Sequence, residues 1–407
     1  MPNIRGDSNK IQGDSSIERL RELRVALVHD DLIQLGGAEK VFMAIAEMFP
    51  DAPIYTSMAT RKWRRRLEGR ELATSFMQRL PLKEKLFKFY FLLYPIAFES
   101  FDLSGYDLVI SSSTRFAHGV ITKPGTTHIC YMHSPGRMFW EPRDYFNPSG
   151  LGISTRRVWG GGTSRLGSLL SPALSYLRLW DRTAAQRVDY FIANSRNIAG
   201  KIKKYYGREA AVVHPFVDLE RFASRSANSE QRTANREGYF LVVTRLAPWK
   251  RVGIAVEAVM QADARLKVVG GGPDEKRLKT LAGSQESGAR SKIEILGNVS
   301  DEELAELYQN CKALIMTQEE DFGITSLEAQ ALGKPVIAYG AGGALETVVK
   351  GKTGEFFSPQ TGEVLAEVLK GFKSKEYSPK TCRSNAEKFS IEIFKEGLLR
   401  EISKIVG

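Results

Sequence analysis

Two glutamates that flank the start of a helix are the strongest chemical signal in the sequence. Glu320 and Glu328 follow the apolar run at 313–317, which is typical of a buried strand. Glu320 lies in the loop after this strand, and Glu328 lies about one turn inside the helix that begins near Gly323. Free amide N–H groups at a helix N-terminus favour phosphate. One carboxylate can accept hydrogen bonds from a sugar and the other from a ribose diol. Taken alone, this spacing is equally compatible with two solvated glutamates.

A second loop supplies positive charge. Arg245 and Lys250 lie five residues apart at the end of the β-branched run at 239–245. A diphosphate leaving group needs its developing charge neutralised by a metal ion or by fixed cations. No Asp-x-Asp pair follows a strand, so we expect these two cations to act without a metal. The alternative, a solvated strand end with a basic cap, is less favoured because this loop and Glu320 follow parallel strands at the same edge of a sheet.

Glycine-rich turns follow two other predicted strands. Gly36 and Gly37 precede a helix, where paired glycines permit a ligand to approach the backbone closely. Gly271 lies in a Gly-Gly-Gly-Pro turn that favours a nucleoside contact over a phosphate cradle. Neither turn has the G-x-G-x-x-G spacing of nicotinamide binders, which argues against a dehydrogenase.

Two series of parallel strands are needed to position these loops. Short β-branched runs separated by helical stretches predict an α/β fold with two doubly wound, Rossmann-like domains that face a central cleft. The predicted strands lie at 24–29, 107–113, 128–133 and 189–194 in the first series and at 239–245, 266–270, 293–296, 313–317 and 335–339 in the second. A capping box at Ser300 and Glu303 is expected to open the helix that reaches Asn310.

The chain divides into four predicted parts. Residues 1–23 form a flexible polar extension, residues 24–215 the first domain, and residues 216–384 the second domain. A polar stretch at 224–238 belongs to the connection between the domains. Residues 385–407 contain a last helix, expected from about Asn385 to Ile405.

The composition fits a globular protein of two domains. The chain has 407 residues, of which 43% are hydrophobic and 26% charged, which excludes disorder, collagen and coiled coil as overall classes. Three separated cysteines indicate neither a disulfide framework nor a zinc site, and the N-terminus lacks a secretory signal. The longest apolar run, residues 89–98, falls well short of the roughly 20 residues of a spanning helix. We therefore expect a cytoplasmic protein.

The excess positive charge is concentrated in one segment. The net charge is +11, and residues 61–90 contain ten Lys or Arg against three Glu, a surplus of seven. Together with the aromatic residues that continue to Phe98, these cations favour docking on an anionic membrane surface. A solvated basic helix followed by a core helix explains the pattern equally well. Docking would suit an acceptor on a polyprenyl diphosphate.

The motifs GGAE, RLxxxK, GGGP and ExFG(x4)E occur in the order found in GT-B glycosyltransferases of family 4, which the chain resembles from about Arg24 onward. The resemblance implies a retaining enzyme with a nucleotide-sugar donor. It implies that Arg245 and Lys250 clamp the donor diphosphate, that Glu328 binds the ribose and that Glu320 contacts the transferred sugar. It also implies that the last helix crosses back to the first domain.

A histidine in the first domain extends the resemblance. The segment His133-Ser134-Pro135 is similar to that of bacterial mannosyltransferase-like members that assemble O-antigen, capsule or exopolysaccharide. There the histidine lines the cleft near the donor sugar and the acceptor, so His133 is predicted in that role. His118 is a weaker candidate. The resemblance favours mannose from GDP-mannose, although the sequence does not exclude GDP-fucose, UDP-glucose or UDP-N-acetylglucosamine.

The expected reaction is a front-face substitution in which the leaving diphosphate helps to deprotonate the acceptor, which is a growing polysaccharide or a lipid-linked glycan. Asp30, Asp31 and His133 are all possible neighbours of the anomeric carbon. The predicted catalytic residues are His133, Glu320, Arg245 and Lys250. The predicted donor-binding residues are Gly36, Gly37, Arg245, Lys250, Gly271, Phe322, Gly323, Ile324 and Glu328.

Two alternatives belong to other functional classes. A sugar-nucleotide epimerase has the same two-domain architecture and would turn over the donor without any acceptor. A nucleic-acid-binding module would use the basic segment, but no recognisable RNA- or DNA-binding motif accompanies it. We therefore expect a nucleotide sugar as the partner, with no nucleic acid and no cofactor.

Overall fold

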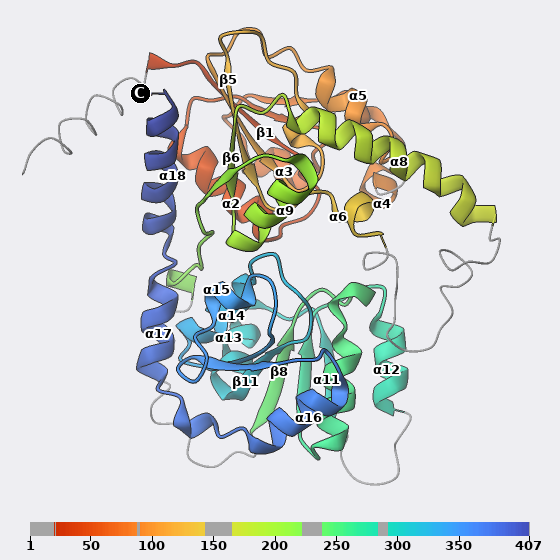
Figure 1. The fold of residues 1–407 in the computed structure, drawn as a ribbon, viewed down its shortest axis with the longest axis vertical. Helices are drawn as coiled ribbons and strands as arrows, with labels where there is room; N and C mark the ends of the chain where they lie inside the picture. The colour runs from red at the N-terminus through yellow and green to blue at the C-terminus, as the bar shows by residue number, and fades with distance from the viewer. Residues whose placement is uncertain are drawn as a thin grey trace, which may run out of the picture. The chain divides into compact units, whose positions relative to one another are not determined.

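The computed structural model describes residue 20 and residues 22–87, 90–142, 165–221, 238–283 and 292–406. The predicted connection at 224–238, except for Gly238, and all but the last few residues of the predicted N-terminal extension lie outside these ranges. Contacts between residues divide the chain into two compact units (Figure 1). Unit 1 comprises residues 1–140, 165–214 and 392–407, and unit 2 comprises residues 141–164 and 215–391.

Unit 1 is built on a parallel sheet of seven strands in the order β3-β2-β1-β4-β5-β6-β7. The strands are β1 (Val25–His29), β2 (Ile54–Thr56), β3 (Leu72–Thr74), β4 (Leu108–Ser113), β5 (Thr127–Met132), β6 (Tyr190–Ala193) and β7 (Ala210–Val212). The four predicted strands of this series are confirmed. The prediction missed β2, β3 and β7, which have only three residues each and therefore no apolar run to detect.

Helices surround this sheet. They are α2 (Gly37–Met48), α3 (Arg61–Arg66), α4 (Lys83–Leu86), α5 (Tyr94–Glu99), α6 (Arg137–Trp140), α8 (Arg165–Ala185) and α9 (Arg196–Tyr206). A 3-10 turn, η3 (Ala117–Gly119), follows β4. The segment at 61–98 is thus not one continuous surface helix, because β3 lies between α3 and α4, and Trp63 and Phe98 are buried.

Unit 2 contains a parallel sheet of six strands in the order β10-β9-β8-β11-β12-β13. The strands are β8 (Tyr239–Val243), β9 (Leu266–Val269), β10 (Ile293–Gly297), β11 (Cys311–Met316), β12 (Val336–Tyr339) and β13 (Gly354–Phe357). All five predicted strands of this series are confirmed, and β13 was missed. The predicted fold class, two doubly wound α/β sheets, is therefore correct.

Both faces of the unit 2 sheet are covered. On β8, Phe240 and Val242 belong to one hydrophobic cluster and Leu241 to another, because successive side chains of a strand point to opposite faces. The helices are α11 (Val252–Gln261), α12 (Glu275–Gly283), α13 (Asp301–Asn310), α14 (Ile324–Ala331), α15 (Ala344–Thr347), α16 (Gly362–Gly371) and α17 (Pro379–Glu387). The predicted capping box of α13 is present, with Ser300 and Glu303 bonding each other's backbone amides.

The C-terminal region forms two helices rather than the single one predicted. The first is α17, and the second is α18 (Ile391–Val406), which belongs to unit 1. One stripe of α18, Phe394, Leu398 and Ile402, is buried, and the ring of Phe394 lies edge-on to Tyr131 at 5.8 Å. The break falls at 388–390, where the amide of Val217 donates to the carbonyl of Phe389.

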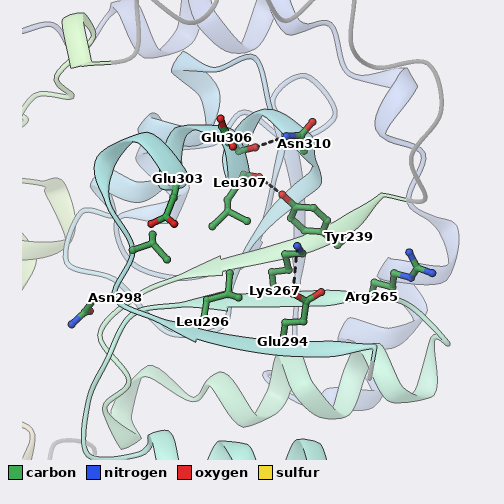
Figure 2. Close-up of a pocket in the computed structure, with 11 residues that line it drawn as sticks. Tyr239, Arg265, Lys267, Glu294, Leu296, Asn298, Glu303, Glu306, Leu307 and Asn310 are labelled. Carbon is green, nitrogen blue, oxygen red and sulfur yellow. Dashed lines mark hydrogen bonds and ion pairs between the residues drawn. The ribbon is translucent and has the colours of Figure 1, made fainter. Parts of the chain in front are cut away.

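A pocket of about 770 Å³ opens on the β8–β10 side of the unit 2 sheet, beside α13. Figure 2 shows that its lining is of mixed charge, with Lys267 facing Glu294 and the hydroxyl of Tyr239 reaching Leu307. Among the described residues, no helix is both long and apolar enough to cross a membrane.

Candidate functional site

The predicted donor loops of unit 2 meet where its strand order reverses. From β8 the chain proceeds outward to β9 and β10, and from the neighbouring strand β11 it proceeds in the opposite direction to β12 and β13. In such sheets, ligands bind in the crevice at the carboxyl ends of the strands, next to the reversal. The loop at 244–251 follows β8 and the loop at 317–323 follows β11, so both flank this crevice.

An ion pair joins these two loops. The ammonium of Lys250 lies 2.7 Å from Oε1 and 2.9 Å from Oε2 of Glu320. Gln318 also donates its side-chain amide to Glu320 Oε1. The hydroxyl of Thr317 donates to the backbone carbonyl of Lys250 at 2.8 Å. Two predicted site residues are therefore in direct contact, and the loops that carry them are bonded to each other.

Arg245 contributes a second cation to the first loop. Its side chain is exposed, and among the described residues no hydrogen bond or ion pair of its guanidinium is found. The neighbouring backbone is fixed, because the amide of Leu246 donates to the carbonyl of Gly271 at 3.0 Å. This loop therefore holds two cations with side-chain partners, Lys250 and Arg251, and one exposed cation, Arg245.

The start of α14 is shaped by two glycines. Gly323 caps the helix with φ at +95°, a conformation that side chains rarely adopt. A Cβ on Gly343 would lie 2.3 Å from the Cα of Phe322, so these backbones touch. Phe322 itself is buried against Val217, Leu327 and Ala386. Phe322 thus anchors the loop to the core, and the first amides of α14, including that of Ile324, lie at the crevice edge.

Glu328 lies one turn inside α14 and is held at both oxygens. The hydroxyl of Tyr308 donates to Oε2 at 3.0 Å, and Arg221 Nη1 donates to Oε1 at 3.3 Å. Arg221 also pairs with Asp301 at the start of α13. Sequence reasoning missed Tyr308, Arg221 and Gln318, since none belongs to a motif and only the fold brings them to the glutamates.

The glycine turn after β9 serves backbone packing. A Cβ on Gly270 would lie 1.9 Å from the carbonyl oxygen of Thr244, and one on Gly272 would lie 2.2 Å from that of Leu246. Gly271 is less constrained, with its nearest contact at 3.3 Å to the Asn298 side chain. Two of the three glycines are therefore explained by the close approach of the β9 turn to the β8 loop.

Unit 1 holds the remaining predicted residues. The amide of Gly36 donates to Glu39 Oε2 at 2.7 Å, so the carboxylate of Glu39 lies at the start of α2, where the prediction placed a ligand beside Gly36 and Gly37. Burial raises the pKa of Glu39. A phosphate bound here would be repelled by the negative charge of Glu39 unless that side chain moved away or took up a proton.

His133 directly follows β5 and is almost fully buried. Its Nε2 lies 2.9 Å from the hydroxyl of Ser112, which is also 3.2 Å from Nδ1 of His29. One serine hydroxyl thus connects the two rings. His118 lies in the core, with its Nε2 3.2 Å from Asp181 and its ring beside Trp180. A fully buried ring does not line a cleft, so His118 is a structural residue.

Asp30 and Asp31 are also engaged within unit 1. Asp30 accepts from the amides of Thr114, Arg115, Phe116 and Ala117. Burial would raise the pKa of Asp30, but the positive charge of Arg115, the neighbouring His29 and these hydrogen bonds together lower it. Asp31 accepts from Tyr94 and Arg115. With both carboxylates buried and bonded in this way, neither is exposed as a nucleophile.

Family models match both units. The model for glycosyl transferases group 1 matches residues 224–389, and the model for glycosyltransferase family 4 matches residues 35–221. The chain belongs to the group 1, family 4 glycosyltransferases. Within this family, the predicted resemblance to bacterial mannosyltransferase-like members stays a prediction.

Curated relatives match parts of the chain. The chain is 31% identical to the D-inositol 3-phosphate glycosyltransferase of Streptomyces avermitilis over 45% of its own length and 44% of that protein. It is 27% identical to the Mycobacterium tuberculosis protein of the same name over 75% of the chain and 68% of that protein. The chain spans about half the length of several of the relatives it matches.

Solved structures share the fold at lower identity. Anabaena HepE, solved in complex with UDP, superposes with a TM-score of 0.64 at 19% identity, covering 93% of this chain and all of that one. WaaG, a glycosyltransferase involved in lipopolysaccharide biosynthesis, superposes with a TM-score of 0.62 at 17% identity, covering 94% and 99%. These likenesses extend over nearly the whole chain.

Proposed function

We propose that this protein transfers a hexosyl group from a nucleotide sugar to a hydroxyl of a glycan or polyprenyl-diphosphate-linked acceptor, with retention of configuration and without a metal ion. The observation that carries the proposal is the Lys250–Glu320 ion pair, because it joins a cation and a carboxylate from two loops at the strand reversal of unit 2. That crevice is where a doubly wound sheet binds a nucleotide.

The chemical step follows from this charge arrangement. The bond between the anomeric carbon and the diphosphate oxygen breaks, and its electron pair leaves with the diphosphate, whose charge Lys250 and Arg245 stabilise. The acceptor oxygen bonds to the anomeric carbon from the same face, and its proton passes to a diphosphate oxygen. Fixed cations stabilise such a leaving group because their positive charge is already in place when the bond breaks.

Glu320 exchanges partners in this scheme. In the structure, Lys250 and Gln318 donate hydrogen bonds to its oxygens. A diphosphate competes for Lys250, because its charge is larger than that of a carboxylate, and thereby releases Glu320 to accept hydrogen bonds from the sugar. Glu328 accepts hydrogen bonds from the ribose, and His133 lines the acceptor side of the reaction.

The donor is proposed to be GDP-mannose, as the His133-Ser134-Pro135 segment suggests. Two named groups of related proteins point to other chemistry, since the curated relatives act on an inositol phosphate by name and HepE was solved with UDP and with UDP-glucose. A turnover assay with GDP-mannose, GDP-fucose, UDP-glucose and UDP-N-acetylglucosamine separates these donors. Release of nucleotide that requires an acceptor supports the proposal, and donor conversion without acceptor supports the epimerase instead.

Metal independence has its own test. Turnover after dialysis against EDTA is expected to equal that of the untreated enzyme, because Lys250 and Arg245 supply the positive charge. Loss of activity that is restored by Mg²⁺ would show that a metal ion carries the leaving group. Proton NMR of the product would report the anomeric configuration, and inversion would contradict front-face transfer.

We also propose that the basic segment of unit 1 docks on an anionic membrane. Five cations of α3 (Arg61, Lys62, Arg64, Arg65 and Arg66) are exposed around the buried Trp63. Four large apolar side chains that follow in the sequence, Phe76, Leu82, Leu92 and Ile96, are exposed as well. Each cation near such a surface contributes roughly 1 kcal/mol before screening. The protein is expected to sediment with phosphatidylserine vesicles at low salt. Absence of binding would refute the membrane-docking proposal.

A further inference from the structure

Two hydrogen bonds hold Glu328 in one orientation. Tyr308 donates to one carboxylate oxygen and Arg221 to the other, from two segments outside α14. Glu320, in contrast, is held by Lys250, the cation that the proposed function assigns to the diphosphate. A carboxylate fixed through both oxygens cannot rotate about its terminal torsion without breaking a hydrogen bond. Glu328 is thus preorganised, whereas Glu320 must change partners.

We propose that Tyr308 and Arg221 are positioning residues that fix the carboxylate of Glu328 for recognition of the ribose hydroxyls of the donor. This inference rests on the proposed function of Glu328 and deepens it. Neither residue needs to touch the nucleotide. Their contribution is to remove the orientational freedom that Glu328 would otherwise lose on binding.

Tyr308 suits this task because it remains a donor. Its ring is fully buried on α13, and burial, reinforced by the negative charge of Glu328, raises the pKa of its hydroxyl well above the usual value. A raised pKa keeps the hydroxyl protonated, so that it remains a donor to Glu328. A buried tyrosine hydroxyl requires a polar partner, and here that partner is the ribose-binding carboxylate rather than a backbone group.

Arg221 supplies charge from the other side. Its guanidinium forms ion pairs with both Asp301 and Glu328, and its side chain is 18% exposed. The guanidinium is a charged donor, and hydrogen bonds from charged donors are stronger than those from neutral ones. Tyr308 and Arg221 thus hold the carboxylate of Glu328 from two sides.

The chain offers a matched control for Tyr308. Tyr239 also contacts α13, and its hydroxyl donates to the backbone carbonyl of Leu307 at 2.8 Å (Figure 2). Replacing either tyrosine by phenylalanine removes one hydroxyl and one hydrogen bond next to the same helix. Only Tyr308→Phe removes a bond to Glu328, so a general loosening of α13 and a specific loss of Glu328 positioning give different results.

The experiment measures ribose recognition directly. Binding of UDP, GDP and their 2′,3′-dideoxy analogues is followed by isothermal titration calorimetry for wild type, Tyr308→Phe, Tyr239→Phe and Glu328→Gln. Because hydrogen bonds to a charged group are among the stronger ones, we expect wild type to bind the ribonucleotide about tenfold or more tightly than its dideoxy analogue. Tyr308→Phe is expected to lower this ratio to about threefold, and Tyr239→Phe to leave it unchanged. In turnover, Tyr308→Phe should raise the donor KM with kcat nearly constant.

The outcomes separate this inference from the proposed function. A wild type that binds neither nucleotide, or that ignores the ribose hydroxyls, refutes the role of Glu328 and this inference with it. If Glu328→Gln abolishes the preference for the ribonucleotide while Tyr308→Phe preserves it, the proposed function stands. The positioning role of Tyr308 is then overturned. If Tyr308→Phe does not fold, Arg221→Met must lower the ratio, with Arg221→Lys giving partial rescue, and an unchanged ratio overturns the proposal.

Discussion

In both units the strand order reverses beside the first strand, between β1 and β4 in unit 1 and between β8 and β11 in unit 2, and in both a carboxylate follows one of these strands. Asp30 accepts from four consecutive backbone amides, at 114–117, after β4. Glu320 accepts from the side chains of Lys250 and Gln318. Backbone amides cannot leave without unfolding the loop, whereas side chains can rotate away.

The same topology therefore supports two different uses of a carboxylate. Asp30 fixes the loop after β4 and is a structural residue, while Glu320 and Lys250 hold charges that a ligand can take over. Position at a strand reversal identifies a possible ligand site, but the type of partner decides whether the carboxylate is available. Exchangeable partners in unit 2 and fixed partners in unit 1 give opposite expectations for substitution.

The largest expected effect is on turnover. Lys250→Ala removes the paired cation of the unit 2 crevice and should lower kcat/KM by about 10²- to 10³-fold, the usual loss for one fixed group that stabilises transition-state charge. The free energy of unfolding should change little. Lys279→Ala on α12 is the control, since Lys279 pairs only with Glu275 among the described residues and lies on an exposed helix face. Equal activity of Lys250→Ala and wild type would remove Lys250 from the site.

Asp30→Asn should have the opposite profile, with a loss of stability. An asparagine presents an NH₂ group where the aspartate has an acceptor, and every neighbouring amide is also a donor, so we expect a loss of about 3 kcal/mol in the free energy of unfolding. Urea denaturation measures it. Asp189→Asn is the control, because exposed Asp189 accepts from one amide, that of His128, and the asparagine carbonyl can replace it.

The pH dependence of this loss follows from the lowered pKa of Asp30. A carboxyl whose pKa is lower in the folded state stabilises the protein above its unfolded-state pKa, near 4, and loses that contribution as the pH falls through the folded value. The difference between wild type and Asp30→Asn should therefore be full at neutral pH and shrink below about pH 4. A constant difference down to pH 2 would contradict this assignment.

The sequence predicted the strands of four to six residues except β13, and it missed the three-residue strands β2, β3 and β7. β3 consists of Leu72–Thr74, all half-buried, and β13 begins at Gly354, whose Cβ would lie 1.9 Å from the carbonyl oxygen of Val336. Lys250 and Glu320 were predicted from their residue types, their place after two strands and the family resemblance of their motifs, and the fold brings them into contact. Arg221 could not be predicted, because it lies 107 residues from Glu328 and only tertiary structure joins them.

A smaller effect tests how the unit 2 loop is positioned. In Gly343→Ala the new Cβ would lie 2.3 Å from the Cα of Phe322, so the backbone at the start of α14 must shift. We expect a loss of about 2 kcal/mol in the free energy of unfolding, as in overpacked cores, together with a higher donor KM. Gly340→Ala is the control, because its Cβ would have no contact closer than 3.5 Å. Equal stability of the two variants would show that the loop is free to adapt.

The smallest effect concerns Glu39, another buried carboxylate of unit 1. Burial, partly offset by His29 and by the Gly36 amide, raises its pKa, so its ionised form is less stable in the folded protein than in the unfolded one. A raised pKa gives a contribution that is present below the unfolded value and lost as the pH rises through the folded value. Glu39→Gln should therefore unfold at slightly higher urea concentration than wild type at pH 7 and at the same concentration near pH 4, where Asp30→Asn still shows most of its deficit. Glutamine keeps an acceptor for the Gly36 amide, so a destabilised Glu39→Gln at pH 7 would mean that the negative charge itself holds the start of α2.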